Sequence, residues 1–331
     1  MSKVTTLFYR GKLVESIHSI KCYIGSVDGK KIFTTNNDDD FIYPRSSIKI
    51  FQAIPFASSN AFKAFNLNQK QIALSCSSHC GEYFHIRELK KWINKTKLKL
   101  SNLKCGVHNP LDYKSTEKLF LSGNRPYQLY NNCAGKHLAM LSACKLNKFS
   151  INNYLDFDHP HQINIRKIFS KFTGEKILTK NYGIDGCGAP QYSFKIKHLG
   201  KALSNLYKSY HSKFEYSLNT KTMIDSILKN PLFIGGSKNL DSNLIKISNG
   251  NIFCKGGAEG VFLFIHLKKG IVGVLKVVDG NERVLPSVLY TLCKKFNILT
   301  REELKKFKFW NSFNLSNHAN IKIGSIETFI K

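Results

Sequence analysis

No long apolar run occurs in the 331 residues of this chain. A transmembrane helix needs about 18 or more consecutive apolar residues, so none is expected. The start of the chain also lacks the apolar core and the small-residue cleavage site of a secretory signal. We therefore expect a cytoplasmic protein that has no membrane partner.

Acidic residues are scarce, because 22 Asp and Glu stand against 50 Lys and Arg, for a formal net charge of +28. Such an excess favours partners such as nucleic acid or an anionic membrane. The basic residues are spread along the chain, however, and clusters such as residues 90–99 and 305–308 alternate with apolar residues at roughly helical spacing. That is typical of solvated helix faces, and no zinc-finger, RNP or basic-zipper motif occurs. We expect no specific nucleic-acid partner.

The nine cysteines form no disulfide framework. Their number is odd, and their spacing is not that of a small secreted domain. We therefore expect reduced thiols, in agreement with a cytoplasmic location. Hydrophobic residues make up 42% of the chain, which is typical of a folded protein with a substantial core.

Strands are predicted at both ends of the chain and helices between them. The predicted strands span residues 4–9, 13–27, 31–35, 251–255, 260–267, 270–278 and 321–329. The predicted helices span residues 46–54, 83–98, 136–144, 162–172, 195–211, 220–228 and 282–296.

This order of elements predicts an α+β protein. The N- and C-terminal strands would share an antiparallel sheet, and the helical segment would pack against it as a second lobe. There is no internal repeat and no low-complexity linker, so we predict a single domain over residues 1–331. Its sheet lobe would comprise about residues 1–45 and 250–331, and its mostly helical lobe about residues 46–249.

The clearest signal for chemistry is the run RSSIK at residues 45–49. Positions i and i+3 share one face of a helix, so Ser46 and Lys49 would point the same way. A serine needs a base to act as a nucleophile, and a lysine whose pKa is lowered by burial or by a nearby cation can take its proton. The plain alternative is a helix start with Ser46 as its N-cap and Lys49 in solvent.

A second signal is the run KGG at residues 255–257, which closes a predicted strand. Serine β-lactamases and penicillin-binding proteins combine S-x-x-K with a late K-T-G on a strand. The order and placement are compatible here, although Gly256 replaces the threonine and no clear S-D-N element lies between. Together the two motifs point to an acyl-transfer enzyme.

A third signal is the polar run SSHCGE at residues 77–82. Small polar residues beside glycine suit a tight turn near a ligand, and Ser78 would supply a second hydroxyl, paired with Lys255. The alternative is an ordinary turn that leads into the next helix.

Two glycine-bearing loops, residues 131–137 and 183–190, carry one cysteine each. Cys133 and Cys187 together could bind zinc or another borderline metal. Neither loop has C-x-x-C spacing, so the alternative is two buried structural cysteines. His137 begins a helix, where a structural role is more typical than metal binding.

Taken together, these segments resemble the Rhizobium etli-type L-asparaginases, also called the asparaginase II or thermolabile family. The matches run in order along nearly the whole chain, and the run at 131–137 is the most specific to the family. They are YRGKLVES at 9–16, YPRSSIK at 43–49, FQA at 51–53, SHCGE at 78–82, CGVHNPLD at 105–112, NNCAGKH at 131–137, DHPHQ at 158–162, GIDGCGAP at 183–190, KGGAEGV at 255–261 and LKVVDG at 275–280.

The resemblance implies hydrolysis of L-asparagine to L-aspartate and ammonia, on a fold like that of serine β-lactamases and serine-dependent glutaminases. It implies two serine–lysine pairs, Ser46 with Lys49 and Ser78 with Lys255. It also implies a homodimer and a small-molecule substrate.

Further roles follow from the same resemblance. Arg45 would hold the substrate or tune the lysines, Asp185 would lie close to the pocket, and Asn132 and His137 would contact the substrate. The zinc site of the family uses two cysteines and a lysine, which match Cys133, Cys187 and Lys136 here. A lysine ligand must be neutral, so zinc binding would depend strongly on pH. The metal would support substrate binding rather than generate the nucleophile.

The chain departs from the family pattern at four positions. Cys80 stands where a serine is usual, Gly256 replaces a threonine, Tyr130 a histidine, and Ile50 a proline. Every predicted catalytic and zinc-binding position is present. The departures bear on turnover and substrate preference more than on the class of reaction.

The predicted reaction is acyl transfer, in which Ser46 attacks the side-chain amide of asparagine and its lysine moves the proton. The alternatives are a glutaminase or another serine amidohydrolase of the β-lactamase fold, a family member without turnover, and a binding protein for nucleic acid.

Overall fold

The computed structural model describes residues 2–331, which divide into two compact units. The first unit contains the chain up to Ser47, Phe194–Tyr207 and Asn243–Lys331. The second contains Ile48–Ser193 and Lys208–Ser242. That the two units form one domain remains a prediction.

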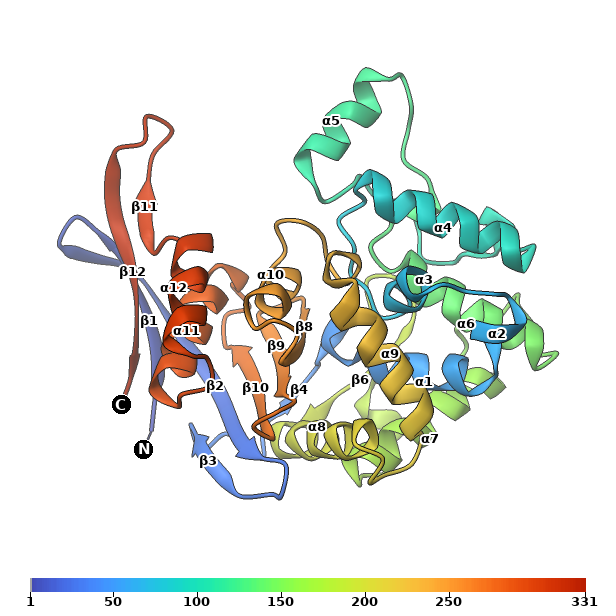
Figure 1. The fold of residues 1–331 in the computed structure, drawn as a ribbon, viewed down its shortest axis with the longest axis horizontal. Coiled ribbons are helices and arrows are strands. Elements are labelled where there is room, and N and C mark those ends of the chain that lie inside the picture. Colours follow the sequence, from blue (N-terminus) through green and yellow to red (C-terminus); the bar gives the residue numbers. More distant parts are fainter. Residues whose placement is uncertain (1) are drawn as a thin grey trace. The chain divides into compact units, whose positions relative to one another are not determined.

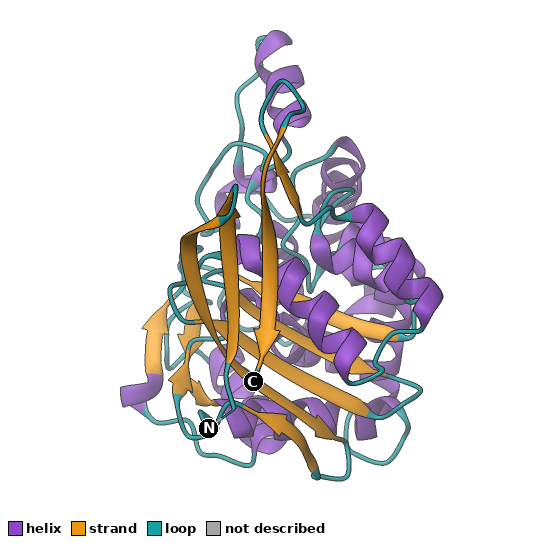
Figure 2. Ribbon diagram, turned by 90° about the vertical axis from the view of Figure 1, so that its left-hand side faces the viewer, coloured by secondary structure: helices purple, strands orange, loops and turns teal. Residues whose placement is uncertain are grey.

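An antiparallel sheet of eight strands forms the first unit (Figures 1 and 2). Its strand order is β11-β12-β1-β2-β10-β9-β8, and β3 pairs with β2. The strands are β1 (Val4–Arg10), β2 (Leu13–Ser26), β3 (Lys31–Thr34), β8 (Ile252–Gly257), β9 (Val261–His266), β10 (Ile271–Val277), β11 (Asn314–Ser316) and β12 (Lys322–Ile330). Strands from the two ends of the chain thus lie side by side, with Val4 opposite Ile330 and Tyr23 opposite Val274. The predicted α+β class with a shared antiparallel sheet is confirmed.

The residue pattern explains the placement of these strands. All six residues of β9 are buried, as expected for a strand covered on both faces. In β1, buried and partly buried residues alternate, which is typical of a strand with one covered face. Helix α11 (Leu285–Lys295) packs on β12 and β1, and α12 (Arg301–Trp310) packs on α11.

The first unit also includes most of α8 (Ile196–Tyr210) and α10 (Leu240–Ile247), and the short strands β4 (Phe41–Ile42) and β7 (Phe194–Lys195), which pair with each other.

The second unit is mostly helical and is built around α1 (Lys49–Ser58). This helix is buried on almost every side by α6 (Ala134–Leu146), α7 (Pro160–Thr173) and α9 (Ser217–Lys229). Phe51 meets Phe172 edge to face at a ring distance of 5.2 Å, and Phe56 stacks on Trp92 at 5.5 Å. The other elements are α2 (Ala61–Ala64), α3 (Gln69–Leu74), α4 (Tyr83–Thr96), α5 (Tyr113–Leu121), β5 (Tyr182–Ile184) and β6 (Pro190–Tyr192).

The helix predicted for residues 46–54 is wrong at both ends. A short 3-10 turn spans Arg45–Ile48, and α1 runs from Lys49 to Ser58 with Pro55 inside it. Proline removes one backbone hydrogen bond, but the burial of α1 on several sides outweighs that local cost.

Five helices were not predicted, namely α2, α3, α5, α10 and α12. Two of them begin with a capping box, Asn68 with Gln71 in α3 and Thr300 with Glu303 in α12, and those pairs are visible in the sequence. Among residues 2–331, no helix is long and apolar enough to cross a membrane.

Candidate active site

Lys49 and Ser78 lie in contact within the second unit. Lys49 begins α1 and is fully buried. Its Nζ donates a hydrogen bond of 2.5 Å to the carbonyl of Ser77 and one of 2.9 Å to Oγ of Ser78. The side chain is therefore anchored on the backbone and aimed at one serine hydroxyl, and the same contact lets a neutral lysine accept that hydroxyl's proton.

The turn after α3 singles out Ser78 among its serines. Ser75 Oγ donates to the carbonyl of Ile72 at 2.6 Å, and Ser77 Oγ donates to the carbonyl of Leu74 at 2.8 Å. Both hydroxyls are therefore engaged in hydrogen bonds to the backbone of the turn. Ser78 is partly exposed, and its hydroxyl faces the lysine.

A second segment holds this turn in place. The backbone N–H of Ser78 donates to the carbonyl of Ile234, and that of Cys80 to the carbonyl of Gly235, at 2.9 and 2.8 Å. The carboxylate of Glu82 accepts bonds from the N–H and the hydroxyl of Ser237 at 2.8 and 2.7 Å. The loop after Ile234 is thereby tied to the turn that carries Ser78.

Ser46 belongs to the first unit, in the 3-10 turn that ends its N-terminal segment. The hydroxyl of Ser47 donates to the carbonyl of Pro44 at 2.6 Å, whereas Ser46 is partly exposed. Arg45 has a positive φ of 52°, which is unusual for a residue with a side chain. The backbone immediately before Ser46 is thus held in a sparsely populated conformation.

The end of β8 lies against this turn, also within the first unit. A Cβ atom on Gly257 would lie 2.5 Å from the carbonyl oxygen of Pro44 and 3.2 Å from the backbone nitrogen of Ser46. Only glycine allows so close an approach. Lys255, two residues earlier in β8, is buried and donates to the carbonyl of Gly256 at 2.8 Å.

The predicted pairing of these residues stays a prediction. The chain passes from the first unit to the second between Ser47 and Ile48, so Ser46 and Lys255 belong to one unit and Lys49 and Ser78 to the other. The contact between Lys49 and Ser78 joins members of the two predicted pairs, and sequence spacing did not indicate it.

Cys133, Lys136 and Cys187 form a buried cluster in the second unit. Lys136 Nζ donates to Sγ of Cys187 at 3.0 Å, and Cys133 hydrogen-bonds the same sulfur. Oδ2 of Asp185 lies 4.0 Å from the ammonium. The two loops that carry single cysteines therefore meet, and both cysteines are buried.

The charges in this cluster are strongly coupled. The hydrogen bond from Cys133, aided by Lys136, lowers the pKa of Cys187 to about 5 against the effect of burial. The hydrogen bond to Cys187, together with burial, raises the pKa of Cys133 to about 12. Burial by itself lowers the pKa of Lys136, but the two cysteines and Asp185 outweigh it and raise that pKa. These shifts favour a protonated Lys136 beside an ionised Cys187.

Two sulfurs and an amine at one place are a donor set that suits zinc. Among residues 2–331, no group of three or more His, Cys, Asp or Glu side chains could hold a metal ion. A metal here would therefore depend on Lys136 as its third protein ligand. The residues fit zinc only if Lys136 loses its proton.

The predicted substrate-binding residues have different surroundings. His137 is fully buried, its Nδ1 lies 2.6 Å from the hydroxyl of Tyr154, and burial followed by the charge of Lys136 lowers its pKa to about 3. The backbone N–H of Asn132 donates to Nε2 of His108 at 2.9 Å. Asp185 lies beside the cysteine cluster, and Arg45 precedes Ser46 in the first unit. Their role in substrate binding stays a prediction.

Two residues of the second unit that sequence reasoning missed support the site. Asn131 donates to the carbonyl of Cys105 at 2.7 Å and accepts the N–H of Cys133 at 2.9 Å, which fixes the start of α6. His79 is buried beside Ser78, and burial, His85 and Lys49 hold its pKa well below its usual range. Both lie inside family-specific runs, which is the signal that could have identified them.

The serine turn and the cysteine cluster are neighbours. A Cβ atom on Gly135 would lie 2.0 Å from the carbonyl oxygen of Leu74, so glycine lets the start of α6 touch the end of α3. The charge of Lys49 acts on Cys133, on His79 and on His137. A buried, cation-rich site within the second unit therefore joins Ser78 to the two cysteine loops.

Comparison with known protein families gives the class of this protein. The profile of a family described as L-asparaginase II matches residues 7–328, nearly the whole chain. The protein is an amidohydrolase. It belongs to the L-asparaginase II family, as the ordered motifs predicted.

Other comparisons give only distant similarity. No curated protein matches the chain. A β-lactamase from Mycobacterium bovis is similar in structure, with 9% identity, a TM-score of 0.41 and coverage of 84% of this chain and 94% of the other. A proposed β-lactamase from Bacteroides dorei DSM 17855 shows 10% identity, a TM-score of 0.40 and coverage of 88% and 93%.

Proposed function

We propose that this protein is an L-asparaginase that hydrolyses L-asparagine to L-aspartate and ammonia through an acyl-enzyme. The observation that carries the proposal is the buried Lys49, which donates to the hydroxyl of Ser78 at 2.9 Å and lies three residues after Ser46. Membership in the L-asparaginase II family supports the substrate.

In the proposed mechanism, Ser46 Oγ attacks the side-chain amide carbon of asparagine. Neutral Lys49 takes the serine proton, and the departing ammonia receives a proton from it. Water then attacks the ester and releases aspartate, and the serine proton is restored. Ser78 would keep Lys49 oriented, with Lys255 as its predicted partner.

The contact between Lys49 and Ser78 makes Ser78 a second candidate for the nucleophile. Two single variants separate the candidates. The protein is mixed with L-asparagine, quenched in acid and weighed by mass spectrometry. We expect the acyl adduct to vanish in Ser46→Ala and to persist in Ser78→Ala. Loss in Ser78→Ala alone would reverse the assignment.

Ammonia release from L-asparagine tests the activity itself, with L-glutamine as the competing substrate. The two amides differ by one methylene, which a pocket discriminates by only about 1–3 kcal/mol, so glutaminase activity is the main alternative. A chromogenic β-lactam should not be hydrolysed. Binding of asparagine without ammonia release would instead indicate a family member without turnover.

We also propose that Cys133, Lys136 and Cys187 hold a zinc ion. Bound zinc would act as a Lewis acid and a fixed positive charge that supports substrate binding. The proximity of Lys136 Nζ to the Cys187 sulfur, at 3.0 Å, supports this donor set. Since zinc binding requires a neutral Lys136 and two thiolates, affinity should fall steeply as the pH is lowered.

A homodimer is proposed on the family resemblance. Light scattering on the purified protein measures its mass directly, and a monomer at micromolar concentration would contradict the proposal.

A further inference from the structure

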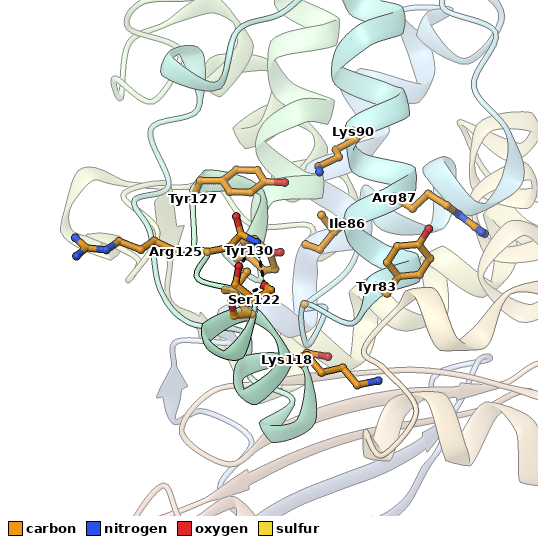
Figure 3. A pocket seen from close by; sticks show the side chains of 13 residues that line it. Tyr83, Ile86, Arg87, Lys90, Lys118, Ser122, Arg125, Tyr127 and Tyr130 are labelled. Carbon is orange, nitrogen blue, oxygen red and sulfur yellow. Dashed lines mark hydrogen bonds between the residues drawn. The ribbon is translucent and has the colours of Figure 1, made fainter.

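The second unit contains a pocket that none of the proposed catalytic or zinc-binding residues lines. Its volume is about 540 Å³, within the range of roughly 300–1,000 Å³ that is typical of small-molecule sites. Residues of α4, α5 and the turn Gln128–Tyr130 form its walls (Figure 3). Ile86 and Leu119 give it a buried apolar floor.

Four cationic side chains and no carboxylate line this pocket. The cations are Arg87, Lys90, Lys118 and Arg125. Arg87 lies 3.7 Å from Glu88, whereas Lys90, Lys118 and Arg125 have no ion pair anywhere in residues 2–331. Gathered cations without carboxylates produce a positive potential that attracts an anionic ligand. Arginine and lysine are also the usual partners of phosphate oxygens.

Three tyrosines supply flat surfaces beside these charges. Tyr127 and Tyr130 meet edge to face with ring centroids 5.0 Å apart, and Tyr83 exposes 77% of its surface. Lys90 and Tyr127 point toward each other, whereas Arg125 extends outward (Figure 3). A long cationic side chain at the rim can turn toward a bound anion without moving the backbone.

The hydroxyl of Tyr127 gives independent evidence for a polar occupant. This oxygen is buried and has no hydrogen-bond partner within residues 2–331. Buried polar atoms in native proteins almost always have a partner, so this one calls for a water or a bound polar group that completes it. The pocket thus combines aromatic surfaces, an unpaired hydroxyl and unpaired cations.

We propose that this pocket binds a free nucleotide, with the base on the tyrosine rings and the phosphates on Lys90 and Lys118. Stacking on aromatic side chains recognises any base, and cations beside it take the phosphate charge. The volume of about 540 Å³ suits one nucleotide rather than a strand. The proposal is independent of the asparaginase activity and can be tested without it.

The test is isothermal titration of the full-length protein with ATP at physiological salt and without divalent cations. We expect saturable binding of one ATP per chain. The double variant Lys90→Ala/Lys118→Ala should weaken it at least about tenfold, because two charge-assisted contacts are lost. The matched variant Lys305→Ala/Lys308→Ala removes the same charge from exposed residues of α12 and should bind like the wild type. Equal weakening in both would show that binding follows net charge and would overturn the proposal.

Three further ligands and one variant test the chemical class. Adenosine and inorganic triphosphate should each bind more weakly than ATP, since each lacks one half of the recognised group. Tyr83→Ala changes an exposed ring and should bring the affinity for ATP toward that for triphosphate. Triphosphate that binds as tightly as ATP would exclude a nucleotide site. A single-stranded oligoadenylate that binds more tightly than ATP, and loses affinity in Lys90→Ala/Lys118→Ala, would assign the pocket to nucleic acid instead.

Discussion

Lys49 and Lys136 are both buried in the second unit, with 0% and 2% of their surfaces exposed. A buried ammonium is costly unless it is hydrogen-bonded or paired. Lys49 is satisfied by a backbone carbonyl and a serine hydroxyl, whereas Lys136 is satisfied by a thiolate. These partners differ in charge, so the two lysines are suited to different tasks. A lysine held by neutral groups is the better proton carrier, whereas Lys136, whose pKa the cysteines and Asp185 raise, must give up its proton before it can bind a metal.

Zinc content tests the role of Cys187 at this scale. We expect about one zinc per chain in the wild type and less than about a tenth of that in Cys187→Ser, because loss of one of three protein ligands opens the site. Cys144→Ser changes another buried cysteine of the second unit and should retain the metal. Elemental analysis after dialysis gives the readout, and equal zinc in the two variants would contradict the assignment.

Gly257 offers a second test at a single residue. Alanine there would place a methyl group 2.5 Å from the Pro44 carbonyl and displace the backbone of Ser46. A misplacement of about 1 Å can cost roughly a hundredfold in rate, so kcat/KM for asparagine should fall by that order.

Gly29→Ala is the matched control for Gly257→Ala. Gly29 lies in the same unit, and a Cβ atom added there would have no other atom within 4 Å. Its positive φ of 93° will cost some stability, but its activity should persist. Full activity in Gly257→Ala would show that Ser46 takes no part in the reaction.

At the scale of elements, hydrogen bonds from the loop after Ile234 restrain the turn that carries Ser78. Its backbone pairs with Ser78 and Cys80, and the two bonds from Ser237 to Glu82 close it. Carboxylate hydrogen bonds of this kind contribute about 1–3 kcal/mol in favourable cases and less at an exposed position. The serine turn is therefore held by a segment far away in the sequence.

Glu82→Gln is expected to loosen this loop. The charge-assisted bonds to Ser237 become neutral ones, so amide exchange in residues 234–239 should accelerate several-fold, and ammonia release should slow. Hydrogen exchange read by mass spectrometry measures the first effect. Glu117→Gln makes the same charge change on an exposed face of α5 and should alter neither. Unchanged exchange in Glu82→Gln would show that backbone pairing alone holds the loop.

Across the whole molecule, buried histidines link stability to pH. Burial lowers the pKa of His85 to about 4 and, with a contribution from His159, that of His161 to about 3. Their folded-state pKa lies below the unfolded value of about 6.5. The unfolded chain therefore binds these protons first, and the stability that neutral histidines provide above about pH 6.5 is lost as the pH falls toward the folded values.

His161→Leu should reduce this dependence, since both ring nitrogens of His161 lack a partner among residues 2–331. Between pH 7 and pH 5, the unfolding free energy of the variant should fall by roughly 2 kcal/mol less than that of the wild type. Urea unfolding at the two pH values measures the change. His318→Leu removes an exposed histidine and should show no such gain. If the unfolding free energy of His161→Leu changed with pH as much as that of the wild type, other residues would account for the pH dependence.

The sequence by itself determined the class of the fold and the family, whereas the roles of the site residues stay predictions. Alternating and continuous apolar runs predicted the strands at both ends, and ordered motifs predicted the L-asparaginase II family. These signals are local, because periodicity and short motifs are written in neighbouring residues. Weak local signals, such as the capping boxes of α3 and α12, were the ones overlooked.

Only the tertiary structure decided which side chains meet. Lys49 and Ser78 are 29 residues apart in the chain, and the sequence had paired each of them with another residue. Lys136 and Cys187 are 51 apart, and only the family resemblance had placed them together. No spacing rule connects such positions. Their contacts follow from the packing of α1 among α6, α7 and α9 and from the close approach that Gly135 allows. Packing of whole helices, which burial of apolar surface drives, places these polar groups together, and the local pattern does not contain that information.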